Sequence, residues 1–206
     1  MKTKTVNFML FIVVIVLYSC GGGNTTKENE TFGKIPSLVV NYEKADSIHE
    51  AKAEKDAKNL KLGDLESFYK KFKTEEDEAE AKLKTDVNAE VVKLKDKAVP
   101  FRVENENFEI KDLKISDEDI NNVKALKLPF TFRLKKPIEI SAFSYEFKYK
   151  ILDKEGNPIE KDQMVSVKLT DNYDTKTIQP DKEAQGSIYL SFKNPAMVNF
   201  KEVVFY

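Results

Sequence analysis

The sequence predicts an α+β protein in which an N-terminal helical hairpin is followed by an antiparallel β-sandwich. Between Tyr42 and Ala98 the chain contains no proline and is rich in Ala, Glu, Lys and Leu, which are strong helix formers. After Pro100 apolar and polar residues alternate with a period of two, which is typical of strands with one buried face. The aromatic residues are also concentrated after residue 100. The composition therefore changes where the periodicity does.

The helical segment, residues 41–98, divides near Gly63-Asp64. Glycine suits the position that follows a helix, and aspartate suits the N-cap of the next helix. We therefore expect helices over residues 42–60 and 65–97, paired antiparallel with their turn at residues 63–64. Thr74-Glu75-Glu76-Asp77 can form a local capping box, which allows a break there. One apolar stripe runs along the second helix at steps of mostly three or four residues: Leu65, Phe68, Phe72, Ala79, Leu83, Val87, Val91, Leu94 and Ala98.

Residues 99–206 have the pattern of about seven short strands joined by turns. Such a pattern resembles an immunoglobulin-like β-sandwich in architecture, and this likeness carries no function with it. Pro129 predicts that its strand begins there or lies at a sheet edge. The alternation slips after Ile110 and after Phe200, as β-bulges would cause. The expected strand segments are 101–103, 108–110, 126–134, 145–151, 165–169, 188–192 and 198–205.

The N-terminus has the layout of an export signal. Lys2 and Lys4 precede an uncharged apolar run, Phe8–Tyr18, that is shorter than the roughly 20 residues needed to span a bilayer as a helix. The run ends at Leu17-Tyr18-Ser19-Cys20, which resembles the lipobox of bacterial lipoproteins, although Tyr18 stands where a small residue is usual. This resemblance implies a signal peptide over residues 1–19.

Membership of that class implies a lipid anchor on Cys20, with diacylglycerol on the sulfur and a further acyl chain such as palmitate. Two or three acyl chains hold a protein at a membrane durably, at about 0.8 kcal/mol per buried methylene. Residues 20–40 would then be the lipidated cysteine and a flexible tether. The alternatives are a plain secretory signal with Cys20 as a free thiol, and an uncleaved anchor. Gly21 does not resemble the aspartate of inner-membrane lipoproteins, so we expect the outer membrane or the cell surface.

No catalytic, cofactor or metal site is expected. The one histidine, His49, falls within the first helix, where a surface or interhelical role is expected, and the acidic run Glu75–Glu80 reads as a solvated helix face. Asp117 and Asp119 form a carboxylate pair in a polar link that we interpret as a helix-turn cap, with a calcium loop as the alternative. Asp171 and Asp174 form a second carboxylate pair, which we interpret as part of a loop between strands. The formal net charge of −1 does not favour nucleic acid as a partner.

These observations predict a non-catalytic, membrane-anchored envelope lipoprotein that binds a partner not specified by the sequence. Two alternatives stay open. One is an accessory protein or enzyme that acts on envelope polymers through its carboxylates, and the other is a structural subunit that oligomerises through its helices.

The first testable expectation concerns Cys20. Mass spectrometry of the protein extracted from membranes should show a mature chain that begins at Cys20 and carries a diacylglyceryl mass. A mature chain that starts elsewhere and keeps a free thiol would contradict the lipoprotein assignment.

Overall fold

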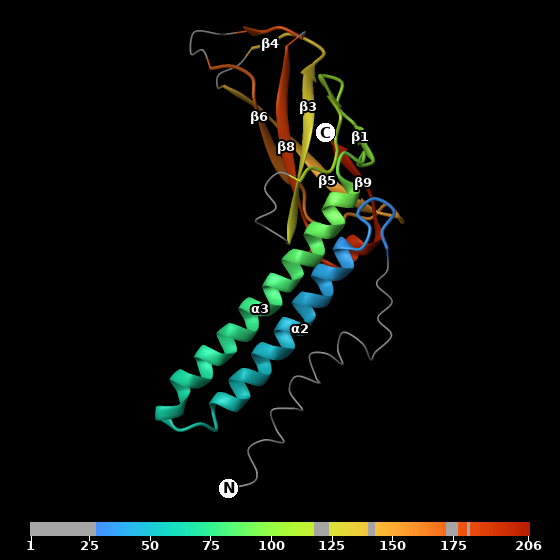
Figure 1. The fold of residues 1–206 in the computed structure, drawn as a ribbon. Coiled ribbons are helices and arrows are strands. Elements are labelled where there is room, and N and C mark those ends of the chain that lie inside the picture. The colour runs from blue at the N-terminus through green and yellow to red at the C-terminus, as the bar shows by residue number, and fades with distance from the viewer. Residues whose placement is uncertain (1–27, 118–123, 140–142, 172–176, 181) are drawn as a thin grey trace.

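The computed structural model describes residues 28–117, 124–139, 143–171, 177–180 and 182–206 (Figure 1). Two antiparallel helices, α2 (Ile35–Ala57) and α3 (Leu62–Leu94), form a hairpin that projects from a body of strands. The expected α+β organisation, a helical hairpin followed by a β-sandwich, is confirmed.

The strands form two main sheets and one small pair. The order is β1-β9-β5-β6 in the four-stranded sheet and β2-β3-β8 in the three-stranded sheet, which together hold the expected seven strands. The separate pair is β4–β7. β1 pairs parallel with β9, so the sandwich contains one parallel pair, whereas the sequence predicted an antiparallel sandwich. The strand bounds are β1 Phe101–Val103, β2 Phe108–Lys111, β3 Ala125–Leu134, β4 Ile138–Glu139, β5 Ser144–Asp153, β6 Gln163–Lys168, β7 Thr177–Ile178, β8 Glu183–Ser191 and β9 Phe200–Phe205.

The last strand lies inside its sheet, between β1 and β5. Val203 and Phe205 are fully buried, as their apolar character predicts. The bulge expected after Phe200 is present, because Leu152 pairs with Glu202 while the adjacent Asp153 pairs with Phe200. The segment before it differs from the prediction: Pro195–Asn199 forms a 3₁₀ helix, begun by a proline and capped by the side chain of Asn194.

Pro129 lies within the central strand of its sheet, which the sequence did not predict. β2 pairs with β3 over residues 131–134 and stops before reaching Pro129. On that side the carbonyl of Pro129 accepts a hydrogen bond from the backbone N–H of Lys114 at 3.3 Å. Proline lacks only the N–H. The position is therefore a local edge within a central strand.

The predicted helix boundaries were wrong by several residues. α2 starts at Ile35 rather than near residue 42, because Pro36 is compatible with a first helical turn. The turn comprises residues 58–61, so Gly63 and Asp64 lie in the first turn of α3. α3 is continuous through Thr74, whose hydroxyl donates to the carbonyl of Lys70 at 3.0 Å instead of capping a new helix.

The chain before α2 is part of the folded body from Asn29 onward, which corrects the tether expected to extend to residue 40. The Asn29 side chain accepts hydrogen bonds from the N–H groups of Thr31 and Phe32 at 2.9 and 3.1 Å. Its amide donates to the carbonyls of Val198 and Phe200, both at 3.1 Å. We call residues 29–33 the Asn29 turn. Gly33 closes it with φ +54°, a conformation that glycine adopts readily.

Phe32 inserts from this turn into the core. Its ring is fully buried and meets Phe192 and Phe200 edge to face, with centroids 5.2 and 4.8 Å away. Within the described residues, one continuous apolar cluster joins the turn, the proximal parts of both helices and both main sheets. The helices contribute Ile35 and Val39 from α2 and Leu83, Val87 and Val91 from α3. The division at residue 98 therefore does not separate two cores.

We predict that Phe32→Ala lowers the free energy of unfolding by about 3–5 kcal/mol, the usual cost of truncating a buried phenylalanine. Urea unfolding followed by circular dichroism measures it. Tyr69→Ala, at a side chain that is 54% exposed, is the matched control and should change stability by less than about 1 kcal/mol. Equal small effects of the two changes would mean that residues 28–34 are a tether after all.

Candidate interaction surface

Among the described residues, the ionisable side chains that the sequence analysis considered do not converge on one site. Cys20 lies outside the described residues. His49 is interhelical: its Nε2 is 3.5 Å from the Glu75 carboxylate, and its ring stacks on Phe72 with centroids 4.6 Å apart. These contacts join α2 to α3, so His49 has a structural role between the helices.

The acidic groups are dispersed. Glu75–Glu80 lie along one continuous helix, and no group of three His, Cys, Asp or Glu that could hold a metal ion occurs among the described residues. Asp117 is 2.8 Å from Lys95, whose hydrogen bond lowers the pKa of that carboxyl, and Asp171 pairs with Lys168. Asp119 and Asp174, the other members of the two carboxylate pairs, lie outside the described residues.

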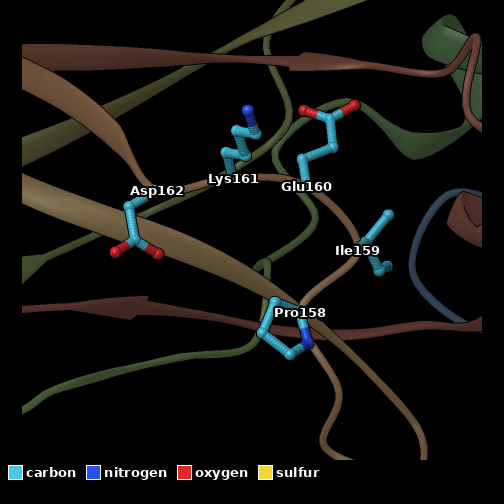
Figure 2. A pocket seen from close by; sticks show the side chains of 5 residues that line it. All are labelled: Pro158, Ile159, Glu160, Lys161 and Asp162. Carbon is cyan, nitrogen blue, oxygen red and sulfur yellow. The ribbon is translucent and has the colours of Figure 1, made fainter.

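We compare two hollows on the described surface, and neither gathers reactive groups. The first is shallow and lined by Pro158–Asp162. Figure 2 shows its Glu160 and Asp162 side chains pointing away from each other. A carboxylate pair for acid–base chemistry requires two groups aimed at one substrate.

The second hollow, about 690 Å³, lies where the end of α3 meets strands β3, β6 and β8. Four lysines line it, Lys95, Lys114, Lys127 and Lys168. Asp117 neutralises Lys95, Asp96 lies 3.1 Å from Lys114, and Asp171 pairs with Lys168. Carboxylates therefore offset much of the positive charge that an anionic ligand would need.

Tyr149, beside the first hollow, has a buried hydroxyl. It hydrogen-bonds the side-chain oxygen of Gln163, whose amide donates to Glu160 at 2.8 Å. Burial raises the pKa of Tyr149 to about 12, and the negative charge of Glu160 adds to the shift. The phenol is thus held neutral, which suits a structural hydrogen bond.

A charged contact braces the hairpin against the sandwich. Lys124, just before β3, lies 2.9 Å from the Glu43 carboxylate on α2 and 4.9 Å above the Tyr42 ring. Burial disfavours the charged form of Lys124, but the hydrogen bond and the attraction to Glu43 outweigh it, and its pKa is raised. The sequence contained no pattern that pairs these residues, since they are about 80 positions apart.

Beyond this brace the hairpin extends away from the sandwich (Figure 1). α3 has 33 residues, so it is about 50 Å long at 1.5 Å per residue. Leu83 is the outermost of its buried residues, and in the outer part of α2 the buried residue is Ala53. The 21 positions from Leu62 to Leu83 therefore carry the hairpin about 30 Å past its last buried contact with the core.

The hairpin also displays apolar side chains, four of them on its outer part or its turn and Val92 near its root. Seven large apolar residues are exposed among the described ones, and five of them are on the hairpin or its turn: Ile48, Leu60, Leu62, Tyr69 and Val92. Leu62 is 88% exposed. Exposed apolar groups concentrated on one projection mark it as the candidate interaction surface.

Comparisons with known proteins add no relative. No family model, no curated protein and no solved structure matches the chain. Within the described residues, no helix combines the length and the apolar character needed to cross a membrane.

We predict that Tyr149 makes stability fall at high pH. The unfolded tyrosine ionises near pH 10, whereas the folded one stays neutral to about pH 12, so raising the pH across this window releases protons from the unfolded chain first. The loss should be about 2–3 kcal/mol between pH 9 and 12. Urea unfolding should show this component in wild type and not in Tyr149→Phe. Tyr189→Phe, the same chemical change at an exposed residue, should keep the wild-type pH dependence; identical slopes in all three proteins would contradict the prediction.

Proposed function

We propose that this chain is a non-catalytic lipoprotein of a bacterial envelope that presents its helical hairpin to a binding partner. The observation that carries the proposal is the hairpin itself, which extends about 30 Å past the core and, over its whole length with its turn, carries most of the exposed large apolar side chains among the described residues. Ordering a residue costs about 1–2 kcal/mol of backbone entropy, and a thin helix pair recovers little of it by burial. A surface of this kind gains stability when a partner covers it.

The anchored part of the proposal rests on the lipobox-like Leu17-Tyr18-Ser19-Cys20, and the start of the folded body sets how far it can lie from such an anchor. Asn29 lies nine residues after Cys20, and a chain of nine residue steps spans at most about 30 Å. With acyl chains on Cys20, the sandwich and the root of the hairpin would therefore stay close to the membrane surface. The outer membrane or the cell surface is the compartment we propose, because Gly21 follows the cysteine.

The first arm of the test concerns the anchor. In the source bacterium, Cys20→Ala should move the chain from the membrane fraction to the soluble fraction. A variant that stays in the membrane would contradict lipid anchoring through this residue.

The second arm concerns the hairpin. Residues 45–78 are replaced by a four-residue Gly/Ser turn, which joins Lys44 to Ala79 and keeps Leu83, Val87 and Val91 in the core. Circular dichroism should show an intact sandwich. Only the full-length chain should capture a partner from solubilised envelopes. Capture by both chains would place the binding surface on the sandwich and contradict the proposal.

A further inference from the structure

The outward face of α3 carries a charge pattern that is complementary to itself. Leu65, Phe72 and Leu83 point toward α2 and the core, and Thr74 lies on the opposite side of the helix. Along that opposite side runs a line of small residues at steps of four and seven: Gly63, Ser67, Thr74, Ala81 and Thr85. All five are exposed, so this face is open to a partner.

The hydroxyl groups on this line are satisfied by their own helix. Ser67 donates to the carbonyl of Asp64 at 2.9 Å, and Thr74 and Thr85 donate to the carbonyls of Lys70 and Ala81, both at 3.0 Å. Their small side chains let another helix approach closely without leaving an unpaired donor. The recognition information must then come from the charges that flank the line.

Those charges change sign across Thr74. When two copies of α3 pack antiparallel around a two-fold axis at Thr74, opposite charges meet. Residues on the same flank of the line meet across the two-fold axis, so the inner pairs are Lys70 with Asp77 and Lys71 with Glu78.

The outer charges continue the same pattern, since Glu66 meets Lys84 and Asp64 meets Lys82. Lys73 and Glu75 lie about 100° from the centre of the line, at the margin of this face. Exposed pairs of this kind are individually weak, but each pair occurs twice in a symmetric dimer.

Other registers are disfavoured by the same residues. Shifting the centre by two residues to Phe72 opposes Glu66 to Asp77. Shifting it to Glu76 opposes Lys71 to Lys82. A parallel pair in register would also bring like charges together, Lys70 beside Lys71 and Asp77 beside Glu78. Like charges brought together are a common means of rejecting wrong pairings.

The fold leaves room for this arrangement. With Thr74 at the centre, Leu62 at the tip of one hairpin lies opposite Asp86 of the other copy. Asp86 is eight residues before the end of α3 at Leu94, or about 12 Å along the helix. The tip therefore stops short of the sandwich.

We infer that two copies of this chain associate through their α3 helices, antiparallel, with the two-fold axis at Thr74. The inference rests on the proposed function in taking the hairpin as the presented surface, and it names a second copy as the partner. It does not depend on acylation of Cys20.

Disulfide formation tests the register. Cys20 is the one cysteine in the sequence, so Cys20→Ser in the full chain provides a cysteine-free background. Thr74→Cys in this background should form a cross-linked dimer under mild oxidation, because residue 74 meets itself across the axis. Ala81→Cys is the matched control: it faces Ser67 of the other copy and should give at least tenfold less homodimer. Mixing Ser67→Cys and Ala81→Cys chains should restore the cross-link.

Charge exchange tests the recognition. Lys70→Glu, and separately Asp77→Lys, should each lower the Thr74→Cys cross-linking severalfold. An equimolar mixture of the two charge variants should restore it, because every altered pair is again opposite. Lys71 and Glu75 are left unchanged because they contact each other within one chain, and Glu75 also contacts His49. Lys44→Glu on α2 makes the same charge change away from this face and should have no effect.

Salt provides the remaining readout: raising it from about 0.05 to 0.5 M should reduce the cross-linking severalfold, since the screening length falls well below 10 Å. Cross-linking of Thr74→Cys no stronger than that of Ala81→Cys, or a mixture that fails to restore it, would overturn the inference. If cross-linking fails while the shortened hairpin still loses its envelope partner, the second copy is wrong and the proposed function stands.

Discussion

The insertion of Phe32 through the Asn29 turn is the contact on which the rest of the arrangement depends. Asn29 uses both ends of its amide, one to shape its own turn and the other to bond the backbone just before and at the start of β9. The Phe32 ring then lies among residues from β9 and from the segment after β8. Because α2 begins two residues after Gly33, this one turn fixes where the hairpin leaves the sandwich.

The proximal and outer parts of the hairpin are stabilised by different contacts. Near the sandwich, Val39, Val87 and Val91 are fully buried in the common core, and the Lys124–Glu43 contact fixes the direction of α2. Farther out, the two helices pack mainly against each other, with Ala53 buried and Phe72 stacked on His49. The core therefore positions the hairpin, while its outer part stays largely exposed.

The proposed membrane anchor and the proposed dimer are geometrically compatible. In an antiparallel pair centred on Thr74, each root at Leu94 is 20 residues from the axis, so the two sandwiches lie about 60 Å apart. A two-fold axis perpendicular to the membrane would let both anchors reach one bilayer, with the paired hairpins parallel to its surface. Two anchors on one surface also raise the effective concentration of a weak pair.

The sequence by itself determined the parts of the molecule that local patterns control. The change of period near Pro100 separated helices from strands, the alternation located seven strands in two sheets, and the apolar end predicted a buried last strand. The charge pattern about Thr74 is also visible in the sequence. It suggests pairing of two helices only because α3 is unbroken at Thr74 and exposes that face.

Tertiary structure alone decided the contacts between distant segments. Asn29 in a polar stretch looks like linker until its partners 169 and 171 residues away are known. Pro129 marks an edge locally, yet only the pairing shows that β2 ends before it. Gly186 has no side chain because the Phe130 ring fills that space: a Cβ would lie 2.4 Å from a ring carbon. In each case the deciding interaction joins residues that chain folding brings together, so no periodicity or spacing in the sequence could reveal it.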